Sequence, residues 1–472
     1  MSPVDRPESC SFAESNFSKA ELGDVRRTAR LVDVVGRICR HPGGSLPEKL
    51  ASPKDLKALY RLCEREEVTH AAIFQSIRQQ TQTQLAQHED VVLVLHDATE
   101  LDYSQHATLV NDLGQIGNGS RRGYICHNSL AVDAQTREVI GLTNQILHCR
   151  VKARAGETLP QRRARESRES RLWVRGTESL PGDWNLVDVC DQGADTFEFL
   201  EHECRSGRRF VVRSHYSRKM FVGREPVGKQ HNLRTYLRGL TSSGGQEVEV
   251  PAVAARPGKK ARKKRLAKLL ISFAAVCIDR PHAKHGEHGN QPLPMFAIRV
   301  WEPHPPRGEK GLEWFLLTNQ PVTTLAKALL VIEWYKTRWV IEEFHKAMKT
   351  GCGIEQLQFT YVERLEPMIA ILSAVATTLL NLRALCSTAD AETRPASTLL
   401  AREYVHMLSH WRYDAPRDLT VREFCMALGR LGGHLNRKHD GLPGWITLWR
   451  GWTKLQSLID GAEFTQRRKK CG

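Results

Sequence analysis

A continuous apolar run, from Val91 to Leu95, is followed two residues later by an aspartate, Asp97. Three of its five residues are β-branched valines. Runs of this length and composition are typical of a strand that is buried on both faces of a sheet. The run therefore predicts a central strand of an α/β fold, and it predicts that Asp97 lies just past the end of that strand.

The elements after this strand follow a recognisable order. They are strands at 124–132 and 139–147, an Arg-rich stretch at 152–175, a strand at 184–190, a helix at 195–205 and a strand at 209–213. Three strands followed by strand, helix and strand is the order of an RNase H-like sheet, in which the first and fourth strands are neighbours. Asp191 ends the fourth strand, so we expect its carboxylate to converge with that of Asp97.

A turn-rich stretch of short β segments, residues 217–313, interrupts this core and predicts a β-rich insertion. It contains the basic run from Gly258 to Arg265, which we interpret as a solvated loop or a phosphate contact. A strand at 314–318 returns to the sheet, and a long helix at about 324–350 closes the core.

That helix places six polar or aromatic residues on one face by their spacing. They are Tyr335, Arg338, Glu342, His345, Lys346 and Lys349. Glu342 between Arg338 and Lys346 could be an ordinary ion-pair ladder. Alternatively, it is the third carboxylate that the two strand-end aspartates would need.

Three converging carboxylates suit phosphodiester cleavage. Two Mg²⁺ ions about 3.5–4 Å apart, held by acidic oxygens, activate the attacking hydroxyl and stabilise the leaving oxygen. We expect Mg²⁺, with Mn²⁺ as a substitute, to be bound by Asp97, Asp191 and Glu342. Neighbouring Lys and Arg side chains would position phosphates of the scissile strand.

The charge of the chain fits a nucleic-acid partner. The 472 residues contain 69 Lys and Arg against 53 Asp and Glu, a net charge of +16. Such a balance favours polyanions through counterion release, although a merely solvated basic surface is the alternative. The composition, 41% apolar and 26% charged, is that of a globular protein and argues against extensive disorder.

The N-terminal region predicts a small helical domain. Ser18 and Glu21 have the spacing of a capping box, and apolar residues then recur at helical spacing, so a helix is expected to start there. Helices are also expected at about 53–66 and 68–87. The first helix carries a basic face, Arg26, Arg27 and Arg30, which is more often a solvated surface than a DNA-reading one.

The remaining features concern environment and assembly. The first fifteen residues lack a basic stretch followed by an apolar core, so we expect a cytoplasmic protein, associated with the nucleoid when bound to DNA. The apolar stretch Met368 to Leu382 is shorter than the ~20 residues that a bilayer requires, and it predicts a buried helix.

Twelve cysteines without a CxxC pair predict reduced, mostly buried thiols. We expect domains at 1–70, 71–370 and 371–472.

Several segments, in order along the chain, match those of a known family. They are Arg26 to Val32, the strand ending at Asp97, Val189 to Asp191 with Ala194 and Asp195, Arg209 to Ser214, Trp314 to Thr318, Tyr335 to Trp339 with Ile341 to Lys346, and Arg430 to Gly433 with the Trp-rich tail. The chain resembles the insertion-sequence-four family of DDE transposases. The spacing of Tyr335, Arg338, Glu342 and Lys349 is that family's own signature.

The resemblance implies specific roles. Asp97, Asp191 and Glu342 would be the catalytic, metal-binding triad of an RNase H-like core, while Tyr335, Arg338, Lys346 and Lys349 would contact phosphates. Similarity further implies that Arg26, Arg27 and Arg30 touch the terminal repeat and that Arg213 contacts the DNA backbone. The implied activity is cut-and-paste transposition, in which a nick frees a 3′-hydroxyl, a hairpin forms and reopens, and the end joins target DNA.

Two aromatic features also follow from the resemblance. Trp314 would receive a base flipped out during hairpin formation, and Trp339 could stack nearby, with a core role as the equal alternative. A helical stripe in the tail would help to form a homodimer on the paired ends, although such stripes are core in most proteins. It consists of Trp445, Leu448, Trp449, Trp452, Leu455 and Ile459.

Two other classes of function stay open. A DNA-binding regulator that has lost catalysis would share the fold and the charge, but the three carboxylates are intact. A nuclease acting on RNA–DNA hybrids would share the core, but it would have no evident use for the basic N-terminal helix or the β-rich insertion.

Overall fold

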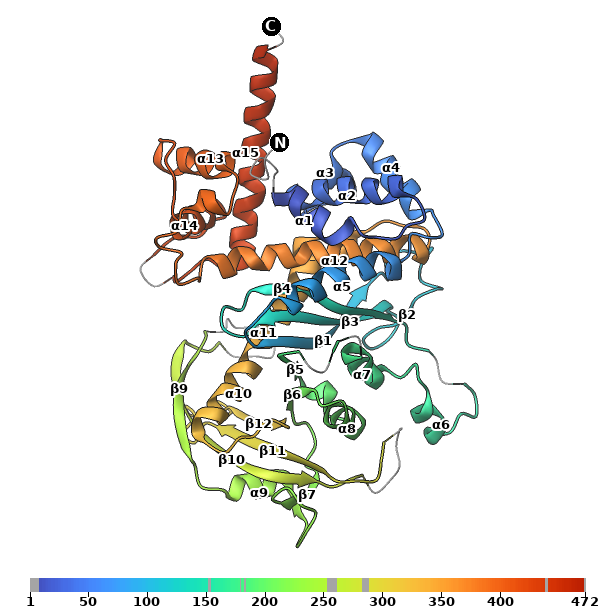
Figure 1. The fold of residues 1–472 in the computed structure, drawn as a ribbon, viewed down its shortest axis with the longest axis vertical. Coiled ribbons are helices and arrows are strands. Elements are labelled where there is room, and N and C mark those ends of the chain that lie inside the picture. Colours follow the sequence, from blue (N-terminus) through green and yellow to red (C-terminus); the bar gives the residue numbers. More distant parts are fainter. Residues whose placement is uncertain are drawn as a thin grey trace. The chain divides into compact units, whose positions relative to one another are not determined.

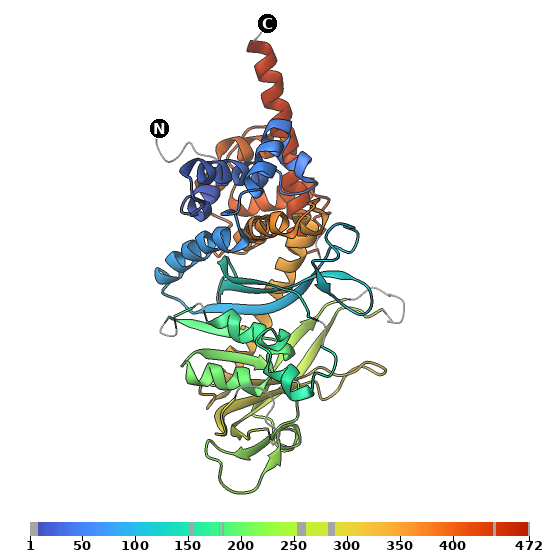
Figure 2. The same ribbon diagram turned by 90° about the vertical axis from the view of Figure 1, so that its right-hand side faces the viewer.

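The computed structural model describes residues 8–151, 154–178, 180–181, 184–252, 261–281, 288–437 and 440–470. Gly258, Lys259 and Lys260 of the predicted basic run lie outside these ranges. The chain forms two compact units (Figures 1 and 2). Unit 1 comprises Met1–Val92, Ala98–Arg150 and Val340–Gly472, and unit 2 comprises Leu93–Asp97 and Val151–Trp339.

Strand β1, Val92–Asp102, passes through both units, and its segment in unit 2 begins a mixed sheet. The order in that unit is β1, β5, β6, β12, β11, β10, β7 and β8. Strand β5, Leu186–Cys190, lies beside β1 and runs parallel to β6, Arg209–Arg213. The prediction that the first and fourth core strands are neighbours is therefore confirmed.

The predicted insertion continues this sheet by antiparallel pairing. Strand β12, Glu313–Thr318, pairs with β6 on one side and with β11, Leu293–Trp301, on the other. Beyond β11 the elements are β10 (Arg265–Ile278), β9 (Gly244–Val250), β7 (Lys219–Val222), β8 (His231–Asn232) and helix α9 (Leu233–Gly239). The insertion is thus β-rich as predicted, and it shares the core sheet.

Helices cover unit 2 on both faces of its strands (Figure 1). On one face, α8, Phe197–Arg205, packs into a buried cluster that includes Cys190, Phe210 and Val212. Helix α10, Leu325–Thr337, contacts β5, β6 and β10. The Arg-rich stretch forms α6, Leu159–Ala164, and α7, Leu172–Thr177.

Unit 1 has its own strands. They are β2 (Gly114–Gln115), β3 (Arg122–Asp133) and β4 (Val139–His148), and β3 pairs with both of the others. Helices α5, His70–Ala86, and α12, Val362–Leu385, pack on β4 and on each other (Figure 2). Among the described helices, α12 alone is long and apolar enough to cross a membrane, but 67% of its most apolar window is buried inside the structure. The predicted buried helix is therefore confirmed.

The N-terminal helices differ from the prediction at their start. The chain forms α1 (Glu8–Phe17), α2 (Val25–Arg40), α3 (Leu46–Leu50) and α4 (Pro53–Cys63). No helix starts at Ser18, whose backbone N–H bonds to the Glu14 carbonyl at the end of α1. Asp24 caps α2 instead, because its carboxylate accepts the N–H of Arg26 at 2.8 Å. The predicted capping box was therefore wrong.

The C-terminal region consists of α13 (Arg402–Tyr413), α14 (Val421–Leu431) and α15 (Trp445–Lys470). Five residues of the tail stripe are buried within unit 1, and Trp452 stacks on Tyr404 with ring centroids 5.1 Å apart. The stripe is thus core, which corrects its assignment to the dimer contact. Cys386 and Cys425 form a disulfide, so the expectation of reduced thiols fails for this pair.

The long helix at 324–350 is not continuous. Helix α10 ends at Thr337, α11 covers Trp339–Lys346, and residues Ala347–Gly351 form a π-helical turn. A π turn changes the angular spacing of side chains, and such turns are frequent at functional sites. The six residues predicted on one face therefore do not share one uninterrupted helical register.

Candidate active site

Asp97 lies in the middle of β1 rather than past its end, because the strand continues to Asp102. Its carboxylate is held by a cation, since Nη1 of Arg338 lies 3.0 Å from Oδ2. Arg338 follows the last residue of α10 and belongs to the same unit. Both side chains are partly exposed, with 15% and 18% of their surface accessible, so solvent can reach the pair.

Asp191 directly follows β5 and turns the chain into a short 3-10 segment. Its Oδ1 accepts the backbone N–H of Gly193 at 2.7 Å. Burial raises the pKa of the Cys190 thiol well above its usual range, neighbouring Asp188 and Glu203 raise it further, and Asp191 and Asp97 both add to the shift. Asp97 and Asp191 thus both lie close enough to Cys190 to influence its thiol.

Aromatic and basic side chains adjoin these aspartates in unit 2. Tyr335 of α10 is buried, and its ring meets that of Trp314 on β12 edge-on, with centroids 5.8 Å apart. Burial raises the pKa of the Tyr335 hydroxyl, Arg213 and Arg338 oppose that shift, and Asp191 adds to it. Arg213, Trp314 and Arg338 therefore adjoin Tyr335, and Arg338 also holds Asp97. Trp339 is 53% exposed.

The other predicted residues lie on α11 and the π turn of unit 1. Glu342 is half-buried and Lys346 is exposed. His345 is buried, and its Nε2 lies 3.2 Å from the side-chain nitrogen of Asn128. Nζ of Lys349 donates to the Glu100 carbonyl and lies 3.1 Å from Glu355. His345 and Lys349 therefore have partners inside the protein.

Among the described residues, no three His, Cys, Asp or Glu side chains are grouped closely enough to hold a metal ion. Unit 2 contributes two of the three predicted carboxylates, Asp97 and Asp191, and Glu342 belongs to unit 1. The donors in unit 2 are hard carboxylate oxygens, which Mg²⁺ and Mn²⁺ prefer. The Arg338 guanidinium on Asp97 marks where a positive charge is favourable.

The predicted basic face of the N-terminal domain is engaged by carboxylates. Arg26 pairs with Asp24 at 2.9 Å and Arg27 with Glu67 at 2.8 Å. Arg30 approaches Asp33 and Asp55, at 3.1 and 3.4 Å. Exposed ion pairs of this kind are weak and can be exchanged for phosphates.

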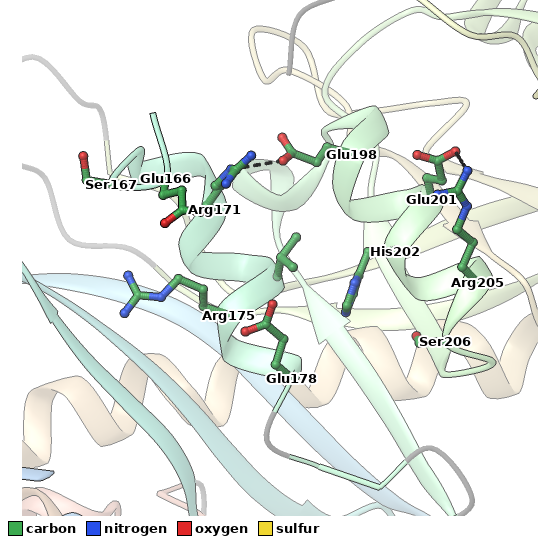
Figure 3. A pocket seen from close by; sticks show the side chains of 11 residues that line it. Glu166, Ser167, Arg171, Arg175, Glu178, Glu198, Glu201, His202, Arg205 and Ser206 are labelled. Carbon is green, nitrogen blue, oxygen red and sulfur yellow. Dashed lines mark ion pairs between the residues drawn. The ribbon is translucent and has the colours of Figure 1, made fainter. Parts of the chain in front are cut away.

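A pocket of about 970 Å³ in unit 2 lies apart from these residues (Figure 3). It opens between α7 and α8, and both signs of charge line it, including Arg175, Glu178 and His202. The described residues of its lining include neither Asp97 nor Asp191. We therefore place the candidate active site at Asp97 and Asp191 and not in this pocket.

Two buried polar clusters of unit 2 were not predicted. Asp195 is fully buried, and its carboxylate holds Arg218 at 2.8 Å and two backbone N–H groups after β6. Asp188 pairs with His96 and Arg208. The available signal was a charged residue inside an otherwise apolar strand, Leu186–Cys190, because a buried carboxylate requires a partner.

Comparison with protein families adds two findings. Residues 9–68 match the model described as transposase DNA-binding, and residues 169–379 match the model described as transposase DDE domain. The first range covers α2 with its arginines. The second contains Asp191, Trp314 and Glu342, while Asp97 precedes it.

Proposed function

We propose that this chain is a DDE transposase, a metal-dependent DNA endonuclease and strand transferase with its own DNA-binding domain, and that it performs cut-and-paste transposition; the matches to the transposase DNA-binding and transposase DDE models support this proposal. It binds the terminal inverted repeats of a mobile element, cleaves at their ends and joins them to target DNA. The observation that carries this proposal is the placement of Asp97 and Asp191 on or directly after neighbouring strands, where both influence the Cys190 thiol. We place the chain in the insertion-sequence-four family, with an RNase H-like core.

Asp97, Asp191 and Glu342 would hold two Mg²⁺ ions. When bound, these ions supply an activated hydroxyl and charge stabilisation at the leaving oxygen. The protein's own contribution is orientation: β1 and β5 fix the two aspartates, and α11 carries Glu342. Arg338 holds Asp97 in this structure, and its guanidinium would be available for a phosphate of the transposon end if Asp97 bound a metal ion instead.

The DNA-binding residues divide by position. Arg213, Tyr335 and Arg338 adjoin the aspartates and would hold the scissile strand. Lys346 is exposed on α11 and would contact phosphate, and Lys349 would do so after leaving Glu355. Arg26, Arg27 and Arg30 would exchange their carboxylate partners for the terminal repeat, which neutralises phosphates and releases counterions.

Cleavage proceeds through a hairpin. The 3′-hydroxyl freed by the first nick attacks the opposite strand, and water reopens the hairpin before joining to target DNA. Trp314 would accept the flipped base and Trp339 would stack beside it, which offsets part of the unstacking cost. The enzyme acts as a homodimer on paired ends in the cytoplasm. Since the tail stripe is core, the contact between subunits uses other surfaces.

The test is incubation of the full chain, with Mg²⁺ or with EDTA, on a linear fragment carrying the element's terminal repeats. Products are resolved on a denaturing gel. We expect Mg²⁺-dependent nicks at the repeat boundary, followed by hairpins, and neither from Asp191→Asn. Asp112→Asn, a change at an exposed loop residue, serves as the matched control and keeps activity.

Three results count against the proposal. Cleavage that survives in Asp191→Asn would refute the metal mechanism. Nicks without hairpins would refute the hairpin route alone. Tight, salt-sensitive binding of repeats without cleavage by the unmodified chain would favour the second candidate, a catalytically silent regulator of transposition.

A further inference from the structure

A buried hydrogen bond links β1 to β5 next to the candidate catalytic aspartates. Nε2 of His96 lies 2.8 Å from Oδ1 of Asp188, and both side chains are 0% exposed. His96 immediately precedes Asp97, and Asp188 precedes Asp191 by three residues. The bond thus connects the two strands from which the metal-binding carboxylates are presented.

Arg208 fixes the other side of Asp188. Its Nε donates to Oδ2 at 2.8 Å and its Nη2 to Oδ1 at 2.9 Å, and Nη1 donates to the Leu180 carbonyl at 3.2 Å. Arg208 is 4% exposed and directly precedes β6. A fork of two parallel bonds defines the orientation of a carboxylate more tightly than a single contact. Asp188 therefore has little freedom to rotate away from His96.

The charges of this cluster are compensated. Burial opposes ionisation of Asp188, but Arg208 and His96 outweigh it and lower the pKa of Asp188. Burial and the Asp188 charge raise the pKa of the neighbouring Glu203 well above its usual range. A buried ion pair of this kind often contributes little net stability, and its most frequent use is to specify geometry.

Strand alternation places the cluster opposite the catalytic carboxylates. Successive side chains of a strand point to opposite faces, so His96 points away from Asp97. Asp188 and Cys190 share a face, and Cys190 packs in the cluster that includes α8. Asp97 lies instead with Arg338, which follows α10. The His96–Asp188 bond is therefore a clamp behind the site, without direct access to DNA.

We infer that His96 and Asp188 are positioning residues that fix the separation of Asp97 and Asp191, with Arg208 holding Asp188 in place. This inference rests on the proposed function. Residues behind metal ligands typically change metal affinity by 10- to 100-fold when altered. Loss of the clamp therefore affects metal binding before it affects DNA binding.

His96 is the residue to change, because replacing Asp188 would leave the buried Arg208 without its counter-charge. His96→Leu removes the bond and keeps the site apolar, while His96→Gln retains a side-chain donor. His88→Leu is the matched control, since Nε2 of His88 lies 2.8 Å from Asp133 in unit 1. Each variant is bound to a terminal-repeat duplex and titrated with Mn²⁺ by electron paramagnetic resonance, with Asp191→Asn as the blank.

We expect His96→Leu to weaken Mn²⁺ binding and to raise the Mg²⁺ needed for half-maximal nicking, each by roughly 10- to 100-fold. Affinity for the duplex should stay within about twofold, His96→Gln should recover most of the loss, and His88→Leu should resemble the unmodified chain. Unchanged Mn²⁺ binding in His96→Leu, or equal losses of metal and duplex binding, would overturn the inference. Absence of Mn²⁺ binding in the unmodified chain would instead refute the proposed function.

Discussion

The guanidinium of Arg338 lies 3.0 Å from Oδ2 of Asp97, so a side chain of the protein itself occupies an oxygen that we assign to metal binding. The same arginine belongs to the set that would hold phosphates. Metal and Arg338 therefore compete for Asp97, whereas DNA and Asp97 compete for Arg338. Binding of the transposon end should consequently favour loading of the metal.

Replacing Arg338 separates these two effects. Without DNA, Arg338→Gln should bind Mn²⁺ roughly two- to tenfold more tightly, because a partly exposed ion pair of about 1 kcal/mol no longer opposes the metal. With DNA, the variant should bind the terminal repeat less tightly. Isothermal titration with Mn²⁺, with and without duplex, measures both. Arg383→Gln, which removes a 2.9 Å pair with Glu343, should change neither; weaker Mn²⁺ binding by Arg338→Gln without DNA would contradict the competition.

The exposure of Trp339 favours stacking over core packing, since 53% of its surface is accessible. Trp339→Ala should slow hairpin formation roughly 5- to 100-fold, as expected for the loss of about 1–3 kcal/mol of base stacking. First-strand nicking and thermal unfolding should be unchanged. Time courses on denaturing gels separate the two steps. Trp411→Ala changes another exposed tryptophan and serves as the control. A lower melting temperature for Trp339→Ala would indicate that Trp339 stabilises the fold by packing and does not stack on DNA.

The order in which β1 and β5 are neighbours could be predicted because it depends on local patterns and on topology. The end of β1 could not, since the polar residues Thr99, Glu100 and Asp102 interrupt the apolar run, and contacts distant in sequence support the strand there: the Asp102 N–H donates to Glu355 at 2.9 Å. Similarly, the helix expected at 324–350 becomes a π-helical turn after Lys346. The sequence gives no sign of this change, because residues 324–350 contain neither proline nor glycine.

The misassigned elements have a common physical origin. Ser18 and Asp24 are both acceptable N-caps, and the sequence does not decide which one a helix uses. An apolar stripe such as that of α15 has the same pattern whether it packs against α14 or against another subunit. The His96–Asp188 clamp was missed because each residue is ordinary alone, and only the strand order brings them together.

Lys49 gives the stability of unit 1 a defined pH dependence. It is buried, with Nζ on the Gly44 carbonyl, and burial lowers its pKa to about 8 despite the neighbouring Cys352. The unfolded chain keeps this proton up to its ordinary pKa near 10.5 and the folded chain does not, so stability rises as pH increases from 8 to 10.5.

Lys49→Met should remove this dependence. We expect the variant to be more stable than the unmodified chain at pH 7, by an amount on the order of 2 kcal/mol, and the difference to shrink toward pH 10. Melting temperatures of both proteins across this range provide the measurement. Lys57→Met, at an exposed position of α4, should follow the unmodified chain at every pH. A constant difference between Lys49→Met and the unmodified chain would show that packing, and not the proton, is responsible.

Replacement by alanine is expected to have opposite effects on stability at two glycines of α15. A Cβ at Gly451 would lie 2.0 Å from the Leu428 carbonyl oxygen, whereas a Cβ at Gly461 would meet nothing within 4 Å. Alanine is favoured over glycine in a helix by about 1 kcal/mol, so Gly461→Ala should be neutral or slightly stabilising. Gly451→Ala must push α15 away from α14, and we expect a loss of roughly 1–3 kcal/mol, typical of overpacking.

Hydrogen exchange localises the effect of Gly451→Ala. Faster exchange should be confined to α14, α15 and the cluster between them, which includes Leu428, Leu448 and Leu455. Exchange in unit 2 and Mg²⁺-dependent nicking of a single end should persist. Unchanged exchange at α14 would mean that the two helices do not approach as closely as Gly451 requires, and loss of nicking would mean that this packing also supports catalysis.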